Sequence, residues 1–263
     1  MKSFGQHFLK NQLAIKKIIA ALDLQEKDTV VEIGPGHGEL TSELIKHPIE
    51  IIAIEKDQRL AKELELRIRN QELWKSRAKI INDDVLKVLK SPDSKFLIHN
   101  SKIVGNIPYY ITGYLLRILS ELENKPSLTV LTVQKEVAER IVAKPPEMNR
   151  LAAITQFWAE TKILAILPAK DFDPPPEVDS AVIVLKTRSS SSISDRELMR
   201  KYYKTVKILF QQPRKTVLNN LTAGLKILKD KALEKMRSLG LTGEERPQNL
   251  GIDQIKKLSE FGN

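Results

Sequence analysis

The chain has 263 residues, 41% hydrophobic and 29% charged, so it is long and apolar enough to bury a sizeable core. It has no cysteine, which excludes disulfides, thiolate metal sites and cysteine nucleophiles, and its four histidines are too scattered to suggest a metal. No apolar run approaches the roughly 20 residues that span a bilayer, and the first residues lack a signal-peptide core, so we expect a cytoplasmic protein without a membrane segment.

The net charge of +10 is unevenly placed along the chain. Residues 189–263 hold 15 basic and 8 acidic residues, and 12 of the basic ones fall between Arg196 and Arg237. Such a field suits a polyanion, of which nucleic acid is the commonest in the cytosol. A solvated basic helix face is the alternative that charge alone leaves open.

Strand and helix patterns alternate through the first part of the chain. Helices are predicted at Asn11–Leu22, Glu39–Lys46 and Leu60–Leu73. The predicted strands are Thr29–Ile33, Glu50–Glu55, Ala78–Ile81, Lys102–Gly105, Leu128–Val133, Thr161–Leu167 and Ser180–Leu185. This alternation indicates βαβ units and a parallel sheet, while the short connection between the last two strands permits an antiparallel pair.

Strand signals stop at a run of serines, Ser189–Ser192, which is typical of a linker. Helical patterns follow at Leu198–Phe210, Val217–Leu225, Lys231–Leu239 and Ile252–Phe261. We therefore expect two domains, an α/β domain at residues 1–188 and a small, basic, all-α domain at residues 189–263.

Three glycines follow the first predicted strand, in the run Glu32-Ile-Gly34-Pro-Gly36-His-Gly38. A glycine-rich turn between strand and helix lets the backbone approach a nucleotide closely. The dinucleotide fingerprint, G-x-G-x-x-G, requires a glycine at position 39, where this chain has Glu39. A nicotinamide cofactor therefore fits poorly. Glu55 lies at the end of the next predicted strand, the position from which an acidic residue binds ribose hydroxyls in nucleotide-binding folds. Asp84, after the third predicted strand, offers a second acceptor at the same sheet edge. Ordinary turns at strand ends are the alternative.

A second motif, Gly105-Asn106-Ile107-Pro108-Tyr109, also follows an apolar strand. The Asn106 side-chain oxygen and the Pro108 carbonyl are two acceptors that a turn can aim at one point. If these two acceptors held both hydrogens of an adenine N6 amine, the lone pair of the amine nitrogen would turn toward a methyl donor. Tyr109 offers a face on which the base can stack. An Asn-Pro turn with a partly buried tyrosine is the alternative.

At this point the chain resembles the ribosomal RNA small-subunit adenine N6,N6-dimethyltransferases. The resemblance rests on six motifs in family order between Gly5 and Leu221. These are Gly5-Gln-His-Phe-Leu9, Val31-Glu-Ile-Gly-Pro-Gly-His-Gly38, Asn106-Ile-Pro-Tyr109, Leu131-Thr-Val-Gln-Lys-Glu-Val137, Phe172-Asp-Pro-Pro-Pro-Glu-Val-Asp-Ser-Ala181 and Arg214-Lys-Thr-Val-Leu-Asn-Asn-Leu221.

The resemblance implies a Rossmann-like class I methyltransferase fold, with a mainly parallel seven-stranded sheet, S-adenosylmethionine as methyl donor and no metal. It implies that Glu55 binds the donor ribose and Asp84 the donor adenine. The rest of the implied donor site is Gln6, His7, Leu9, Gly34, Gly36, Gly38, Lys56, Val85 and Asn106. The target base is implied to lie against Asn106, Pro108, Tyr109 and Phe172, and RNA against Lys204, Lys207, Arg214 and Lys215.

The implied activity is dimethylation of two adjacent adenosines in the 3′-terminal hairpin loop of small-subunit (16S) ribosomal RNA. The implied partner is a precursor of the small ribosomal subunit, and we expect a monomer. The chain departs from the family at His7, Tyr110, Asn149 and Pro213; Pro213 replaces a frequent arginine and removes a charge from an expected RNA contact. Two rivals remain, a large-subunit adenine N6-methyltransferase of the antibiotic-resistance type and a non-catalytic ribosome assembly factor.

Overall fold

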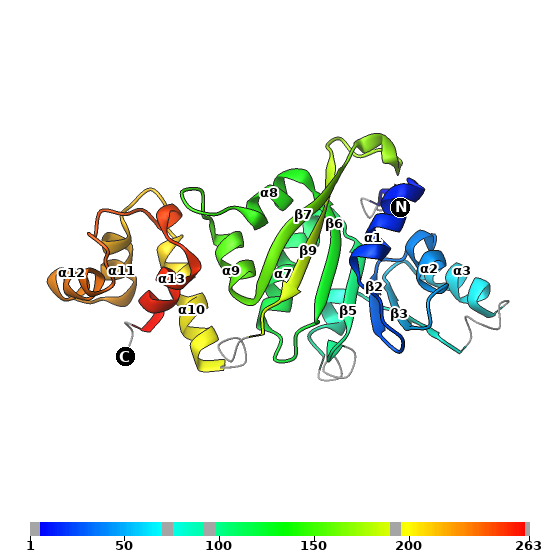
Figure 1. The fold of residues 1–263 in the computed structure, drawn as a ribbon, viewed down its shortest axis with the longest axis horizontal. Coiled ribbons are helices and arrows are strands. Elements are labelled where there is room, and N and C mark those ends of the chain that lie inside the picture. Colours follow the sequence, from blue (N-terminus) through cyan, green and yellow to red (C-terminus); the bar gives the residue numbers. More distant parts are fainter. Residues whose placement is uncertain (1–5, 70–75, 92–97, 190–195, 261–263) are drawn as a thin grey trace. The chain divides into compact units, whose positions relative to one another are not determined.

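Seven strands form the sheet on which the site is built (Figure 1). The computed structural model of the chain describes residues 6–69, 76–91, 98–189 and 196–260. The strand order is β4-β3-β2-β5-β6-β9-β7. The strands span Thr29–Ile33 (β2), Glu50–Glu55 (β3), Ala78–Asn82 (β4), Lys102–Asn106 (β5), Leu128–Gln134 (β6), Ala159–Leu167 (β7) and Ser180–Thr187 (β9).

Five neighbouring strands, β4 to β6 in sheet order, run parallel, and β9 pairs with β6 in the antiparallel direction. Val30 and Val31, on opposite faces of β2, are both fully buried, as expected for a parallel strand covered on both sides. Beside β2 the order of the strands reverses, with β3 on one side and β5 on the other. The predicted mainly parallel α/β sheet is confirmed.

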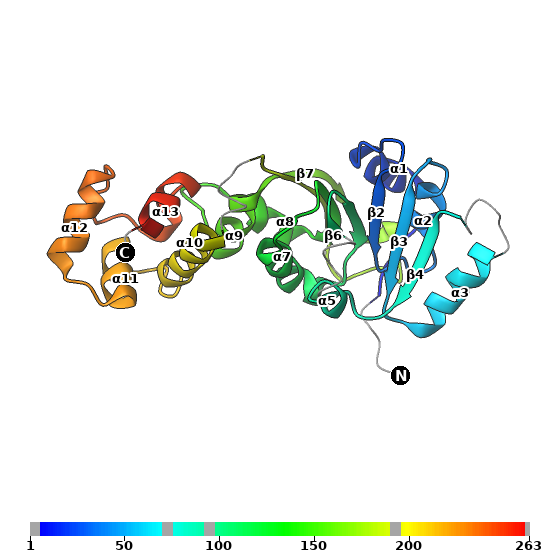
Figure 2. The same ribbon diagram turned by 90° about the horizontal axis from the view of Figure 1, so that it is seen from below.

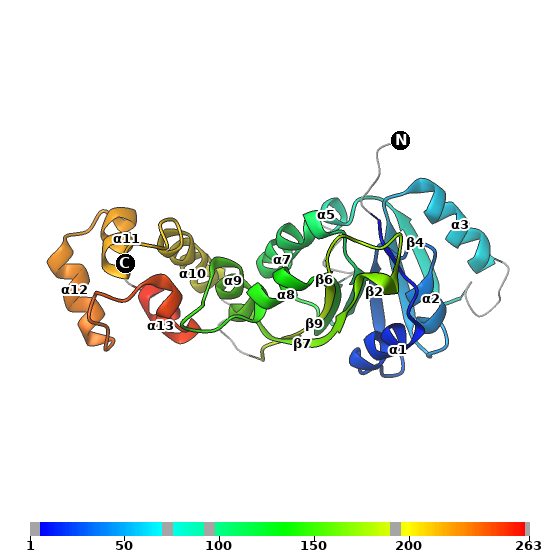
Figure 3. The ribbon, with the colours of Figure 1, turned by 90° about the horizontal axis from the view of Figure 1, so that it is seen from above.

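Helices cover both faces of this sheet. Helix α1 (Gln12–Ala21) lies on one face, and α5 (Val85–Val88) and α7 (Thr112–Glu121) lie on the other (Figures 2 and 3). Helices α2 (Glu39–Leu44) and α3 (Gln58–Arg69) connect the strands at the β4 side. Asn11 begins α1 because its side chain accepts hydrogen bonds from the N–H groups of Leu13 and Ala14.

A two-stranded antiparallel ribbon joins the N-terminal segment to a distant loop. Strand β1 (Phe8–Leu9) pairs with β8 (Phe172–Asp173), and Leu9 lies opposite Phe172. The Lys10 N–H extends the ribbon by donating to the Asp171 carbonyl at 2.9 Å. Sequence analysis predicts neither strand, because two residues are too few to show a period.

The remaining helices are α8 (Lys135–Val142), α9 (Arg150–Trp158), α10 (Arg196–Leu209), α11 (Val217–Leu225), α12 (Lys229–Ser238) and α13 (Ile252–Ser259). The chain divides into two compact units, residues 1–138 with 160–187, and residues 139–159 with 188–263. The second unit thus includes 139–159, which the expected boundary at 188/189 placed in the first domain. The physical reason is packing: Phe157 stacks on Tyr202 at 4.0 Å, and the Tyr202 hydroxyl donates to the Ala153 carbonyl at 3.0 Å.

Some predicted features fall outside the described residues. These are Gly5, the end of the predicted helix Leu60–Leu73 beyond Arg69, the linker Ser189–Ser192 beyond its first serine, and Phe261 at the end of the last predicted helix. Within the described ranges, no helix is both long and apolar enough to cross a membrane.

Candidate active site

A pocket opens at the carboxyl ends of β2, β3, β4 and β5. Its empty volume is about 880 Å³, including open solvent at the mouth. The predicted residues that line it are Gln6, His7, Gly34, Gly36, Glu55, Lys56, Asp84, Val85, Asn106, Pro108, Tyr109 and Phe172. Two predicted donor-site residues do not line it: Leu9 is a buried core residue, and Gly38 caps α2.

The glycine loop takes backbone conformations that other residues rarely adopt. Gly34, Gly36 and Gly38 have φ of +66°, +60° and +86°. A Cβ on Gly36 would also lie 2.7 Å from the Phe8 ring. The loop therefore needs glycine for its turn and for its close contact with β1, and it presents bare backbone to the pocket.

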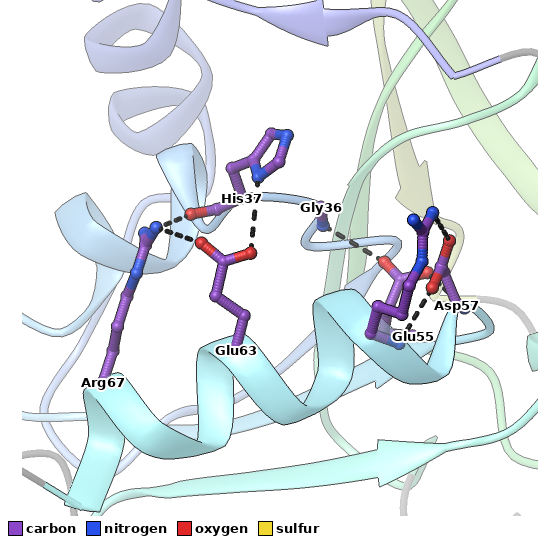
Figure 4. A network of polar contacts seen from close by, with 7 residues as sticks. Gly36, His37, Glu55, Asp57, Glu63 and Arg67 are labelled. Atoms are coloured by element: carbon purple, nitrogen blue, oxygen red, sulfur yellow. Dashed lines mark hydrogen bonds and ion pairs between the residues drawn. The ribbon is translucent and has the colours of Figure 1, made fainter.

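Glu55 holds this loop from the end of β3. Its two carboxylate oxygens accept the Gly36 N–H at 3.1 Å and the Asp57 N–H at 2.8 Å (Figure 4). Burial raises the pKa of Glu55, and these two N–H groups act in the opposite direction. Since a carboxylate has about four acceptor positions, Glu55 can still accept from hydroxyls in the pocket.

Helix α3 supports the same loop on its outer side. Arg67 donates to the His37 carbonyl at 2.6 Å and pairs with Glu63 at 2.7 Å, and Glu63 lies 3.9 Å from the His37 ring (Figure 4). The glycine loop is thus fixed by groups from both β3 and α3.

Asp84 and Lys56, which follow β4 and β3, form an ion pair in the pocket wall. Lys56 Nζ lies 2.8 Å from Asp84 Oδ2, and Asp84 Oδ1 accepts the Leu86 N–H at 2.9 Å as the cap of α5. Burial alone would raise the pKa of Asp84, but the Lys56 and Leu86 bonds prevail and lower it. Asp84 is therefore an ionised acceptor in the pocket wall.

Asn106 ends β5 with its amide group held in one orientation. Its Nδ2 donates to the His7 carbonyl at 2.6 Å, which leaves Oδ1 as an acceptor. The Pro108 carbonyl already accepts from the Ile111 N–H at 3.1 Å and keeps a second lone pair. The preceding residue has to be glycine, because a Cβ on Gly105 would lie 2.5 Å from the Ile33 carbonyl oxygen.

Aromatic side chains complete the wall beside Asn106. The Tyr109 hydroxyl bonds Ser180 Oγ at 2.7 Å, and the Tyr109 ring lies nearly parallel to His7 at 6.1 Å between centroids. Burial raises the pKa of Tyr109, so its hydroxyl is neutral. Phe172, only 1% exposed, reaches the same pocket from β8. The structure thus brings all four predicted base-contacting residues together.

Sequence reasoning missed several lining residues. They are Phe8, Ile33, Ile54, Asp57, Asp83, Ile107, Tyr110 and Ile111. Most are immediate neighbours of predicted residues, so extending each motif by one or two positions would have included them. Phe8 stood inside a quoted motif, but its contact with Gly36 depends on the unpredicted β1–β8 ribbon.

The predicted RNA-binding residues lie in the second compact unit, residues 139–159 with 188–263, which we call the helical unit; the other is the sheet unit. All four are exposed. Lys204 and Lys207 share one face of α10, and Arg200, which sequence reasoning missed, extends the row by one turn. Arg214 and Lys215 lie in the loop before α11. Buried Asn220 braces this loop by donating to the carbonyls of Gln212 and Thr216, each at 3.1 Å.

Among the residues that the structure describes, no three His, Cys, Asp or Glu side chains gather in a way that could hold a metal ion. The acidic side chains of the pocket instead make hydrogen bonds or ion pairs with protein groups.

A family model described as ribosomal RNA adenine dimethylase matches residues 1–263. Two relatives named Ribosomal RNA small subunit methyltransferase A come from Dehalococcoides mccartyi and Mycoplasma capricolum. They are 37% and 36% identical, each over 98% of this chain, and the matches cover 86% and 95% of the relatives.

Solved structures of similar fold include a dimethyladenosine transferase from Plasmodium falciparum. It is 26% identical with a TM-score of 0.83, and the match covers 97% of each chain. The 23S rRNA methyltransferase ErmE, at 24% identity, covers 96% of this chain and 98% of its own with a TM-score of 0.76. The latter likeness shows a shared methyltransferase fold.

Proposed function

Because the chain belongs to the ribosomal RNA adenine dimethylase family, we propose that it methylates N6 of two adjacent adenosines in the 3′-terminal hairpin loop of small-subunit ribosomal RNA, twice each. The enzyme class, an rRNA adenine dimethyltransferase, follows from the family and from relatives at 36–37% identity. The observation that carries the proposal at this site is the convergence of Asn106, Pro108, Tyr109 and Phe172 on the same pocket as the glycine loop.

S-adenosylmethionine is the proposed methyl donor, and the pocket fits it. The bare backbone at Gly34 and Gly36 lets a ligand approach closely, and Glu55 retains acceptor positions for a ribose diol. The ionised Asp84, with Val85 beside it, suits the amine edge and face of an adenine ring. Gln6, His7 and Lys56 are proposed to contact the rest of the donor, and Leu9 and Gly38 act by positioning β1 and α2.

The target amine is proposed to lie against Asn106 and Pro108. Asn106 Oδ1 and the Pro108 carbonyl accept its two hydrogens and turn the nitrogen lone pair out of the ring system. Tyr109 and Phe172 hold the base by stacking. When bound, S-adenosylmethionine supplies an electrophilic methyl group, so the main task of these residues is alignment, which can contribute about 7–11 kcal/mol in favourable cases.

No histidine base is needed for the proton. The amine nitrogen becomes acidic as it gains the methyl group, so it releases a proton to the Asn106 or Pro108 oxygen or to water. The base has to leave its stack to reach the pocket, which costs least in a loop.

The helical unit is proposed to hold the RNA through Lys204, Lys207, Arg214 and Lys215, while the sheet unit binds the donor. We propose that the enzyme works as a monomer in the cytoplasm, on a precursor of the small subunit, and so takes part in its biogenesis. Pro213, where the family often has arginine, removes one positive charge from this proposed contact.

Two rivals are separated by one experiment. Labelled S-adenosylmethionine is offered with purified unmethylated small-subunit particles, and separately with naked large-subunit RNA. We expect two dimethylated adenosines, located by mass analysis, in the small-subunit RNA alone. Methylation of the large-subunit RNA alone would favour the antibiotic-resistance type, and absence of transfer to either, with particles still bound, would favour an assembly factor.

A further inference from the structure

Two tyrosines beside the pocket point into solvent. Tyr110, in the short 3-10 helix Tyr109–Ile111, lines the pocket and is 65% exposed, and Tyr114, one turn later on α7, is 42% exposed. The opposite face of α7 packs inward through Leu115 and Leu119, both fully buried. Rings that are left exposed next to a substrate pocket are available to stack on a ligand.

Gly113 lies between these tyrosines in the sequence, at an exposed position in the first turn of α7. Glycine is less favourable than alanine within a helix, and a Cβ at this position would have no described atom within 4 Å. Packing within the described unit therefore gives no reason for glycine here. A bare backbone does suit the close approach of another molecule. We refer to Tyr110, Gly113 and Tyr114 as the tyrosine stripe.

Positive charge accompanies the stripe. Lys90 Nζ bonds the Tyr114 hydroxyl and lies 4.7 Å from the centroid of its ring. Lys87, on α5 three residues before Lys90, is also exposed. It lies two residues after Val85, which lines the pocket. Exposed aromatic rings next to lysines are the combination that binds unpaired nucleotides, because bases stack on the rings and phosphates meet the ammonium groups.

We propose that the tyrosine stripe binds the base of the nucleotide next to the target adenosine. This inference rests on the proposed function. A target base that enters the pocket keeps its covalent link to its neighbours, and Tyr110 belongs both to the pocket wall and to the stripe. The neighbouring base then stacks on the tyrosine rings across Gly113, and Lys90 meets the adjoining phosphate. The stripe is thus a positioning surface for the base that flanks the methylation site.

The test uses Tyr114, which does not line the pocket. Tyr114→Leu keeps an apolar side chain but removes the ring, and Tyr114→Phe keeps the ring. Ile166→Ala, at a 45% exposed position on β7, is the matched control. Affinity for a fluorescent small-subunit rRNA fragment is measured by anisotropy, and donor affinity by calorimetry. Tyr114→Leu should weaken RNA binding at least about fivefold, the lower end for one stacked base, while Tyr114→Phe and the control bind as wild type.

A second measurement identifies the nucleotide. One abasic residue is placed in the fragment on either side of the target adenosine. The wild type should lose affinity at one of the two positions, and Tyr114→Leu should lose none further there. Equal affinity of Tyr114→Leu and wild type for the intact fragment, or equal sensitivity of both proteins to each abasic fragment, overturns the proposal. Because binding is read without turnover, an inactive wild type would refute the proposed function and still leave this test decisive.

Discussion

Glu32 is a buried carboxyl group through which the stability of the fold should depend on pH. It lies within β2, fully buried, and accepts the Thr41 hydroxyl at 2.7 Å, while its other carboxyl oxygen has no partner among the described groups. Burial raises the pKa of Glu32 from 4.5 to about 8, and the Thr41 bond only partly opposes this. Glu32 is therefore protonated in the folded protein at neutral pH.

This predicts an unusual pH dependence of stability. Between pH 4.5 and about 8 the unfolded chain has released the Glu32 proton and the folded chain has not, so the free energy of unfolding falls as pH rises. The slope is about 1.4 kcal/mol per pH unit. Glu32→Gln keeps the acceptor for Thr41 and should remove this contribution, making the variant progressively more stable than wild type toward pH 8.

Urea denaturation at pH 5, 6, 7 and 8 measures the difference. The exposed Glu136→Gln, on α8, provides the control with the same chemical change. If the Glu32→Gln and wild-type curves stay parallel across this range, the buried carboxyl is ionised in the fold and the assignment is wrong.

At the scale of elements, the short β1–β8 ribbon positions the pocket. Asn11 links it to α1: its side-chain oxygen caps the helix and its Nδ2 donates to Asp171 Oδ2 at 2.9 Å, just before β8. Asn149 makes a comparable pair of bonds at the start of α9, capping it and donating to the Arg140 carbonyl at 2.8 Å. The two asparagines share a structural role, but only Asn11 lies beside a strand that reaches the pocket, since Phe8 of β1 lines it.

We expect Asn11→Ala to lower the free energy of unfolding by about 2–5 kcal/mol, the sum of about 0.5–2 kcal/mol for the lost cap and about 1.5–3 kcal/mol for the lost hydrogen bond to a charged group. It should also weaken donor binding, because Phe8 of β1 and the two residues before it, Gln6 and His7, line the pocket. Asn149→Ala should cost about 1–3.5 kcal/mol, because its second bond is to a neutral carbonyl, and leave donor affinity unchanged. Calorimetric titration of both variants checks this; equal donor affinity in the two would show that the ribbon does not shape the pocket.

Elements with a clear period and length were predictable from sequence. The strand predicted at Leu128–Val133 is one residue longer as β6, and α11 has the predicted bounds, Val217–Leu225. By contrast, the three helices between residues 106 and 160, α7, α8 and α9, were not identified from the sequence. Helix α9 gives little signal because Ala152, Phe157 and Trp158 leave it buried nearly all round.

The candidate site was predictable where motifs follow strands, because the carboxyl ends of parallel strands meet at one edge. Gly36, Glu55, Asp84 and Asn106 come together on this principle alone. Their fixed orientations were not predictable. The bond from Asn106 to the His7 carbonyl joins residues 99 positions apart, and it depends on tertiary structure that no local pattern encodes.

At the scale of the whole molecule, the division of the chain into two compact units decides which variants can test RNA binding. Removing residues after Ser189 would take Tyr202 away from Phe157 and the Ala153 carbonyl, so lost binding could reflect damage to α9. Replacing Arg214 and Lys215 by alanine instead changes only exposed side chains, while Asn220 continues to brace their loop.

Arg214→Ala with Lys215→Ala should weaken binding to small-subunit particles and leave donor affinity intact. Each lost phosphate contact should also flatten the slope of log affinity against log salt by about 0.7–0.9. Lys16→Ala with Lys17→Ala, two exposed positions on α1, removes the same charge from the sheet unit as a control. Wild-type affinity and slope in the Arg214/Lys215 variant would mean that the loop before α11 makes no contact with the RNA.

Asn106 is proposed to hold the target amine in a pocket whose other walls bind the donor. The most direct measurement is labelled methyl transfer from S-adenosylmethionine to small-subunit particles by Asn106→Ala, with donor affinity measured on the same protein. Donor binding should persist although Asn106 is also an implied donor residue, because Glu55, Asp84 and the glycine loop are unchanged and His7 still bonds the Pro174 carbonyl through its ring at 2.8 Å. Transfer should fall by two to three orders of magnitude, since one such contact to a reacting group contributes about 2.7–4 kcal/mol. Wild-type transfer by this variant would contradict the claim.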